Sequence, residues 1–353
     1  MTTLKLKDYS IFIGHPSSEI SQIIKAGNYS KVAILVDNNT HQHCLPVLSE
    51  KLDMGFVTIE IPAGEVHKTI HSCHHLWTEM MLHELDRHSL LINLGGGVVG
   101  DMGGFCAATY LRGIDFVQVP TTLLSQVDAS VGGKLGIDFN FVKNSVGVFK
   151  NPKAVFVDPT YLKTLPEAEI RSGFAEVFKH ALIADARLWD DLKVISDLPS
   201  VNWEHLLDRS LRIKQDIVEK DPLEKSLRKA LNFGHTIGHA IESFSLKTDK
   251  PLLHGEAVAI GIVCESWLSH QLGKLTANEL KEITAFVNKI YPSYFFEEIN
   301  FPEIMTYMKK DKKNRGGVIN FTFIPSIGKA EVNHTADRNL IEKSLCYYLE
   351  NNF

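Results

Sequence analysis

The first half of the chain alternates short apolar runs with a segment whose apolar residues recur at helical spacing. The run at residues 31–37 (KVAILVD) ends in an acid, and the run at 89–94 (SLLINL) leads directly into glycines. Such runs are typical of buried strands, and the pattern over 68–85 is typical of a helix. Strands are therefore expected at residues 31–37, 55–61, 89–94, 116–119 and 154–157. Strands that alternate with helices predict a parallel sheet with helices packed on it.

After about residue 166 the pattern changes to long segments with helical periodicity. Helices are expected at residues 167–184, 203–219, 223–244, 255–272, 277–290 and 338–349, with one strand at 318–324. The simplest division places an α/β domain of Rossmann-like, nucleotide-binding type at residues 1–165. A mainly α-helical domain that binds metal and substrate is expected at residues 166–353.

Composition excludes some classes of function and leaves the predicted fold unchanged. Lys and Arg number 37 against 42 Asp and Glu, a net charge of -5, which argues against general nucleic-acid binding. The five cysteines are widely spaced and include no CxxC, as expected for free thiols in a reducing compartment. The sequence shows neither a signal-peptide pattern nor an apolar run long enough for a membrane span, so we expect a cytoplasmic protein.

A glycine-rich segment, GGGVVGD at residues 95–101, follows one predicted strand and precedes a helix-like stretch. It contains GxGxxG at Gly95, Gly97 and Gly100, which permits close approach of the backbone to a pyrophosphate at a helix N-terminus. The alternative is an ordinary glycine-rich turn, because a lone GxGxxG is a weak signal.

The acid that would bind the ribose is not about 20 residues downstream, as in the usual dinucleotide fingerprint. The better candidate is Asp37, which lies upstream at the end of the strand predicted at 31–37. Glu65 and Lys68 follow another predicted strand and either serve the cofactor or face solvent.

A metal site is indicated by polar residues in the helical half. Arg228, Asn232, His235 and His239 would share one face of a single helix, although a polar stripe can also be a solvated face. Gly234 and Gly238 cost about 1 kcal/mol each in a helix, which close approach of a ligand or another helix would explain. His254 and Glu176 offer further ligands, and two imidazoles with one carboxylate are typical of catalytic zinc.

A second group of residues suits an anionic substrate. The segment 128–134 (DASVGGK) combines glycines with Lys134, and Asn144 follows it. Arg112 supplies a planar guanidinium group for phosphate or carboxylate. With Lys179, Lys214, Arg228 and the pair Lys312 and Lys313, these residues indicate a substrate with at least two anionic groups.

Six motifs then occur in one order: GGGVVGD, VPTTLLSQVDASVGGK, GFAEVFKHAL, LNFGHTIGHAIE, HGEAVAIG and DKKN. From about residue 37 to 313 the sequence resembles the 3-dehydroquinate synthases, which are sugar phosphate cyclases of the shikimate pathway. Phe178 and His180 depart from many relatives within GFAEVFKHAL.

The resemblance implies NAD, a divalent metal (usually Zn²⁺, with Co²⁺ as an alternative) and a homodimer. The implied reaction converts 3-deoxy-D-arabino-heptulosonate 7-phosphate to 3-dehydroquinate by transient oxidation, phosphate elimination, reduction, ring opening and aldol closure. The resemblance also implies that the metal ligands are Glu176, His235 and His254, and that His239 is a nearby catalytic group. The implied substrate positions are Asp128, Lys134, Asn144, Lys179, Lys214, Arg228, Asn232, Lys312 or Lys313, and Arg112 reaching the phosphate of the partner subunit. The implied cofactor positions are Asp37, Glu65, Lys68, Gly97, Asp101, Thr121, Thr122, Lys143 and Thr164, to which the loop pattern adds Gly100.

Three alternatives remain at this point. A metal-dependent polyol dehydrogenase would not need the anion-binding residues Lys134, Asn144, Lys179 and Arg228. A sister cyclase would act on a different sugar phosphate. A non-enzymatic nucleotide-binding protein would keep the glycine loop without the metal residues.

Overall fold

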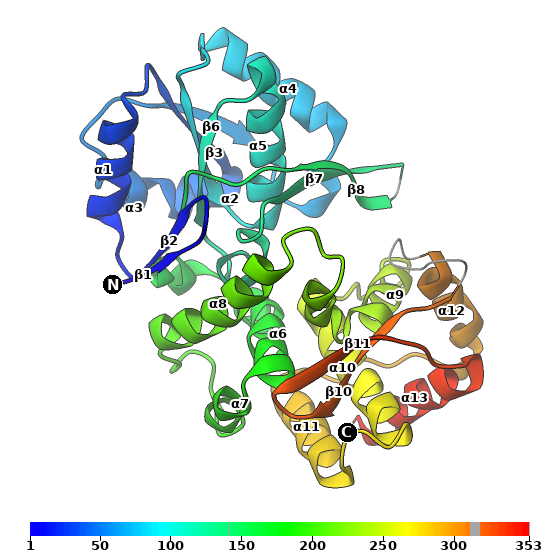
Figure 1. The fold of residues 1–353 in the computed structure, drawn as a ribbon. Helices are drawn as coiled ribbons and strands as arrows, with labels where there is room; N and C mark the ends of the chain where they lie inside the picture. The colour runs from blue at the N-terminus through cyan, green and yellow to red at the C-terminus, as the bar shows by residue number, and fades with distance from the viewer. Residues whose placement is uncertain (141, 311–317, 353) are drawn as a thin grey trace. The chain divides into compact units, whose positions relative to one another are not determined.

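The chain forms two compact units in a computed structural model that describes residues 1–140, 142–310 and 318–352 (Figure 1). The first unit contains Met1–Pro166 and Asn202–Gln215, and the second contains Glu167–Val201 and Asp216–Phe353. Helix α8 (Trp203–Lys220) therefore begins in the first unit and ends in the second. The domain division between residues 165 and 166 stays a prediction.

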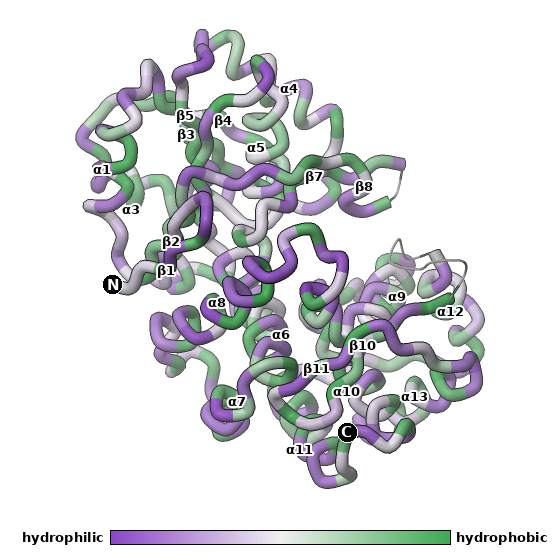
Figure 2. Tube along the Cα trace, viewed as in Figure 1, coloured by the Kyte–Doolittle hydropathy of each residue, from purple (hydrophilic) through white to green (hydrophobic). Residues whose placement is uncertain are grey.

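The first unit is built on a seven-stranded sheet in the order β1-β2-β9-β6-β5-β3-β4. Its strands are β1 (Thr2–Lys5), β2 (Ser10–Ile13), β9 (Ala154–Val157), β6 (Asp115–Pro120), β5 (Leu90–Gly95), β3 (Val32–Asp37) and β4 (Val57–Ile61). The pair β1 and β2 is antiparallel, and the other neighbours run parallel. Strands β3 and β5 are covered on both faces, so they are almost entirely apolar (Figure 2).

Helices cover both faces of this sheet. One core contains Leu35 from β3 and side chains from α4, α5 and β7, whereas the neighbouring Ile34 belongs to a second core beneath α1 and α3. The elements outside the sheet are α1 (Ser17–Gly27), α2 (Asn38–His43), α3 (Leu45–Ser49), α4 (Ile70–Leu82), α5 (Gly97–Thr109), the hairpin β7 (Lys134–Phe139) and β8 (Val142–Phe149), and the short turns η1 (Glu65–His67), η2 (Tyr110–Arg112), η3 (Ser125–Ala129) and η4 (Pro159–Thr164).

The second unit is mainly helical, and α10 lies at its centre. This helix contacts α6, α9, α11 and α13, which explains why its apolar residues occur all around the axis. The elements are α6 (Glu167–Ala184), α7 (Ala186–Leu192), η5 (Leu227–Asn232), α9 (His235–Ser245), α10 (His254–Gln271), α11 (Ala277–Ile290), η6 (Glu298–Asn300), α12 (Phe301–Lys310), β10 (Phe321–Ser326), β11 (Lys329–His334) and α13 (Arg338–Asn351).

An α/β first unit and a mainly helical second unit confirm the predicted fold class. The single helix predicted at 223–244 is wrong, because the chain forms η5, turns at Gly234 and begins α9 at His235. Gly234 has φ of +79°, in the left-handed region that interrupts a helix. The helical spacing from Asn232 to His235 is therefore not real. The strands β1, β2, β7, β8 and β11 were not predicted.

Candidate functional site

The carboxyl ends of β3, β5 and β6 lie side by side in the first unit. The register pairs Leu35 with Asn93, and Gly95 with Pro120, so Asp37, Gly95 and Pro120 reach one edge of the sheet. After β3 the chain adds β4 on one side and then β5 on the other, which makes the β3–β5 boundary a topological switch point. In open α/β sheets, ligands bind in the crevice outside such a point.

The predicted glycine loop lies at this edge and has two kinds of glycine. A Cβ on Gly97 would meet only the Ala129 Cβ, at 3.6 Å, so this glycine is not required for packing. A Cβ on Gly103 would lie 2.1 Å from the Asn93 Oδ1, which shows that α5 packs closely on β5. The residues around Gly95–Gly97, Gly100 and Asp101 line a pocket with Ser125 and Ser130.

Asp37 ends β3 and also caps α2. Its Oδ1 accepts hydrogen bonds from the Thr40 backbone N–H at 2.8 Å and from the Thr40 hydroxyl at 3.0 Å. This side chain is therefore fixed at the switch point, where a carboxylate can also bind ribose hydroxyls.

The buried Lys68 contacts both a predicted cofactor residue and a predicted substrate residue. Its Nζ donates to the Asp101 Oδ2 at 2.7 Å and to the Asn144 Oδ1 at 2.6 Å. Burial lowers the pKa of Lys68, but the charges of Asp101 and Glu65 outweigh it and the net pKa is raised. Burial raises the pKa of Asp101, and Lys68 offsets only part of that effect.

The other predicted residues of this unit lie in several places. Lys214 donates to the Asp128 carboxylate at 2.6 Å and contacts the Asp128 carbonyl, and the Thr121 N–H donates to the Gly95 carbonyl at 3.0 Å. The Thr122 hydroxyl lies 2.9 Å from the Ser125 hydroxyl. Exposed positions are occupied by Arg112 in η2, Lys134 at the start of β7, Lys143 in β8 and Thr164 at the end of η4.

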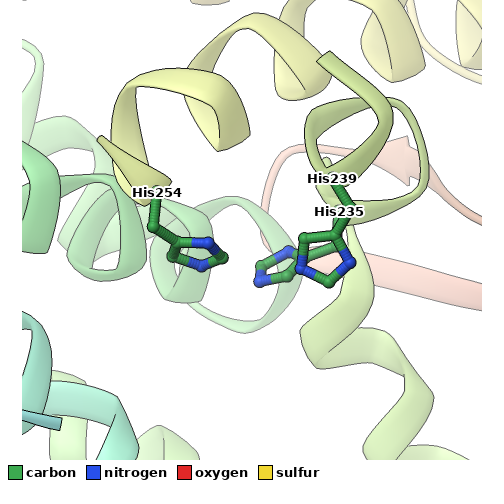
Figure 3. Close-up of side chains that lie close together, drawn as sticks. All are labelled: His235, His239 and His254. Atoms are coloured by element: carbon green, nitrogen blue, oxygen red, sulfur yellow. The ribbon is translucent and has the colours of Figure 1, made fainter. Parts of the chain in front are cut away.

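In the second unit, three helices bring Glu176, His235 and His254 together. Glu176 is fully buried in α6, and the two histidines are the first residues of α9 and α10. The Glu176 Oε1 lies 3.4 Å from the His235 Nε2 and 3.8 Å from the His254 Nε2. His239, one turn along α9, completes a group of three imidazoles whose ligand atoms lie within 4.8 Å of one another (Figure 3).

These separations suit a shared cation. Ligands at about 2.0–2.1 Å from a tetrahedral ion lie about 3.4 Å from each other, because the tetrahedral angle fixes that ratio. The Glu176 Oε1 is buried and accepts no hydrogen bond of normal geometry among the described residues. A buried carboxylate oxygen that faces two imidazole nitrogens is a donor set that zinc or cobalt fits.

The Nδ1 atom of each imidazole contacts an oxygen on the side of the ring away from Glu176. The His235 Nδ1 lies 3.1 Å from the Phe233 carbonyl, and the His254 Nδ1 lies 3.3 Å from the Glu242 Oε2. In both rings Nε2 is then the nitrogen that faces Glu176. Sequence reasoning missed Glu242, although its spacing of seven from His235 puts it on the same face of α9.

Neighbouring charges set the protonation of the cluster. Burial alone would raise the pKa of Glu176, but Lys179, in contact with its Oε2, and His235 hold that pKa well below its usual range. Burial lowers the pKa of His254, but Glu176 and Glu242 outweigh it and raise the pKa to about 9. Uptake of a cation by His254 would therefore release a proton.

Close helix packing positions these side chains. A Cβ on Gly261 of α10 would lie 1.9 Å from the Gly234 carbonyl, and one on Gly238 would lie 2.9 Å from the Ala257 carbonyl. The buried Glu265 accepts from the Gly234 N–H at 2.8 Å and from the Ile237 N–H at 3.1 Å. The predicted close approach at Gly234 and Gly238 is thus that of another helix.

Arg228 and Asn232 lie in η5 rather than on α9. The Arg228 guanidinium donates to the Pro222 carbonyl at 2.8 Å, and the Asn232 amide donates to the Glu224 carboxylate at 2.8 Å. Lys312 and Lys313 lie outside the described residues. Within the described part of the chain, none of the helices has both the length and the apolar character to cross a bilayer.

Two family models match the sequence. The model for the 3-dehydroquinate synthase N-terminal region matches residues 58–172, and the model for its C-terminal region matches 173–314. A 3-dehydroquinate synthase of Parabacteroides distasonis is 41% identical over 94% of this chain and 95% of its own length. The resemblance seen in the sequence is confirmed.

Solved structures agree with the fold. A 2-epi-5-epi-valiolone synthase from Streptomyces hygroscopicus, with NAD⁺ and Zn²⁺ bound, superposes with a TM-score of 0.87 at 25% identity over 99% of both chains. A 2-deoxy-scyllo-inosose synthase superposes with a TM-score of 0.86 at 21% identity over 98% of this chain and 99% of its own. The two family models together cover more than half of the sequence, and the chain belongs to the 3-dehydroquinate synthase family.

Proposed function

We propose that this chain binds NAD at the glycine loop and a divalent cation at Glu176, His235 and His254, and uses both in the reaction of its family. That reaction converts 3-deoxy-D-arabino-heptulosonate 7-phosphate to 3-dehydroquinate and inorganic phosphate, which makes the enzyme a phosphate-eliminating carbon–oxygen lyase. The observation that carries the proposal is that one buried carboxylate lies close to two oriented imidazoles in a chain of this family. The Glu176 Oε1 is 3.4 Å from the His235 Nε2 and 3.8 Å from the His254 Nε2.

The cation site depends on residues with distinct roles. Glu176 supplies the anionic ligand, and the contact with Lys179 keeps it ionised. The Phe233 carbonyl orients His235 so that its Nε2 faces Glu176. His239 lies beside the ligands, within reach of a substrate hydroxyl bound there. When bound, a divalent cation supplies a Lewis acid and NAD supplies a hydride acceptor.

Three observations support the glycine loop as the cofactor site. The loop lies at the switch point of the sheet, Gly97 leaves the backbone open, and Asp37 stands at the adjacent strand end. The relative of known structure that is 25% identical over 99% of this chain was solved with NAD⁺ and Zn²⁺, and the inosose synthase was solved with NAD⁺ and Co²⁺. We therefore expect NAD with Zn²⁺, and Co²⁺ as a functional substitute.

The substrate has a carboxylate and a phosphate, so it needs several fixed donors. Lys68 holds the Asn144 side chain, and Asp128 holds Lys214, which limits the motion of these two substrate candidates. We assign Lys134, Asn144, Lys179, Lys214, Arg228 and Asn232 to the binding of the two anionic groups. With these positions fixed, the work of the protein is positioning and charge stabilisation.

The direct test is to incubate the metal-loaded protein with NAD and the heptulosonate phosphate and to follow phosphate, dehydroquinate and reduced cofactor together. We expect one phosphate for each dehydroquinate, with no lasting accumulation of reduced cofactor. Accumulation of reduced cofactor in proportion to product would indicate a dehydrogenase. Phosphate release only from a different sugar phosphate would indicate a sister cyclase.

We also propose a cytoplasmic homodimer in which Arg112 reaches the phosphate of the partner's substrate. Its support is the exposed position of Arg112 in a turn where both Leu111 and Arg112 have positive φ, of 50° and 69°. Backbone strain of this kind is more frequent at functional sites than elsewhere. Light scattering would give the oligomeric state. Mixed dimers of Arg112→Ala and Lys179→Ala chains should regain activity if the guanidinium acts across the interface.

A further inference from the structure

Glu242 is a buried acid at the edge of the cation site that the proposed function does not yet use. Its side chain is only 8% exposed. A carboxylate is removed from water only at a cost, unless it accepts strong hydrogen bonds. The His254 Nδ1 lies 3.3 Å from its Oε2.

The geometry places Glu242 and Glu176 on opposite edges of one imidazole ring. The His254 Nε2 faces the Glu176 Oε1 at 3.8 Å, while Nδ1 faces Glu242. An N–H on Nδ1 that donates to Glu242 leaves the lone pair of Nε2 for a cation, and the nearby negative charge makes that nitrogen a better donor.

The backbone between Glu242 and His254 reinforces this contact. The hydroxyl of Ser245, which is fully buried, donates to the Glu242 carbonyl at 2.8 Å and accepts from the Leu252 N–H at 3.0 Å. The last turn of α9 thus holds the segment that leads into α10. His254 is the first residue of α10, so the position of its backbone depends on this connection.

We propose that Glu242 is a positioning residue that orients the imidazole of His254 and so sets the affinity and geometry of the divalent cation site. This inference rests on the proposed function, because it concerns the same cation. Glu242 acts through His254 and not by contact with the substrate.

The test is zinc affinity, measured by competition with a chelator on metal-stripped protein. Glu242→Leu should weaken zinc binding by about 10- to 100-fold, the usual effect of losing a partner behind a ligand. Glu242→Gln keeps an oxygen acceptor without the charge and should lose less. The matched control is Glu342→Gln, which changes a half-buried glutamate that pairs with Arg338 on α13, far along the chain from the ligands. It should bind zinc like the wild type.

A second readout separates positioning from general support of the fold. The visible spectrum of the Co²⁺-loaded protein reports ligand geometry, and it should change in Glu242→Leu and to a smaller extent in Glu242→Gln. Thermal unfolding of each metal-free variant shows whether it is folded. If Glu242→Leu does not fold, zinc affinity and the Co²⁺ spectrum of Glu242→Gln decide the test.

The outcomes distinguish this inference from the proposed function. If the wild type binds zinc and forms dehydroquinate while both Glu242 variants match its zinc affinity and Co²⁺ spectrum, Glu242 does not position His254. If the wild type itself fails to bind zinc, the proposed cation site is wrong, and this inference falls with it.

Discussion

The two proposed sites are built from different parts of the polypeptide, one in each unit. In the first unit the glycine loop offers backbone N–H groups at the end of β5, beside the ends of β3 and β6. In the second unit Glu176, His235 and His254 are side chains from three helices, brought together by close packing of α9 and α10. One site depends on a local turn, and the other depends on contacts between distant segments.

Because of this difference, we expect the two sites to respond differently to amino-acid substitution. A backbone site tolerates substitution wherever the backbone path is kept and the ligand still has room. A side-chain site fails when any ligand is removed or when the helices that carry the ligands separate. Substitutions at ligands, at helix contacts and in the glycine loop distinguish the two kinds of site.

Removing a ligand from the second site should abolish function. We expect His254→Ala to lose both bound zinc and dehydroquinate formation, because the remaining donors no longer enclose a cation. Metal content by mass spectrometry and phosphate release check the two effects. His270→Ala, near the end of the same helix, loses only a contact with the Leu275 carbonyl and should retain metal and turnover. Full activity of His254→Ala would refute the ligand assignment.

Separating α9 from α10 should act through stability. A Cβ on Gly261 would lie 1.9 Å from the Gly234 carbonyl, which is backbone and cannot rotate away. We expect Gly261→Ala to lower the free energy of unfolding by about 3 kcal/mol, at the upper end for overpacking, and to weaken zinc binding as His235 shifts. Urea unfolding checks this value. Gly55→Ala meets nothing within 4 Å and should stay within about 0.5 kcal/mol of the wild type.

The same contrast explains what the sequence could predict. Strands β3, β5 and β9 and the glycine loop were found because a buried parallel strand and a strand–glycine–helix transition are local patterns. The break at Gly234 was missed because it depends on Gly261 and Glu265 of another helix. The hairpin β7–β8 was missed because β8 is largely exposed and lacks a strong apolar alternation.

Among the site residues too, those with a clear local sequence signal were predicted and those without one were not. Glu176 and His254 were found as unusual polar residues in apolar segments, and the family motifs supplied their pairing. For Glu242 the only local signal is its spacing of seven from His235, which is weak because an acid near the end of a helix is common on surfaces. Its role becomes visible only when the His254 Nδ1 is found 3.3 Å away.

A smaller effect concerns the loop before η5. The Asp221 carboxylate accepts from the Lys225, Ser226 and Arg228 backbone N–H groups at 2.7–3.0 Å. Burial raises the pKa of Asp221, but these donors outweigh burial and lower it. The stabilisation is therefore complete above the unfolded pKa of about 3.9 and is lost as pH falls through the lower folded value.

Asp221→Asn should cost about 2 kcal/mol of unfolding free energy at neutral pH, a typical value for hydrogen bonds to a charged group. The difference from the wild type should shrink as the pH falls below about 4. Asp216→Asn removes only an exposed partner of Lys220 and should change stability little at any pH. A gap between wild type and Asp221→Asn that stays constant down to pH 2 would show that the charge is not involved.

The smallest effect concerns Gly97 in the glycine loop. Gly97→Ala places a Cβ 3.6 Å from the Ala129 Cβ, an ordinary contact, so the unfolding free energy should not fall. NAD affinity should nevertheless drop by about tenfold, equivalent to about 1.4 kcal/mol, because the added methyl group stands where the pyrophosphate approaches the backbone. Zinc affinity should stay unchanged. Calorimetric titration with NAD, beside urea unfolding and chelator competition, separates the three quantities. Gly97→Ala with wild-type NAD affinity would place the cofactor elsewhere and remove the contrast between a backbone site and a side-chain site.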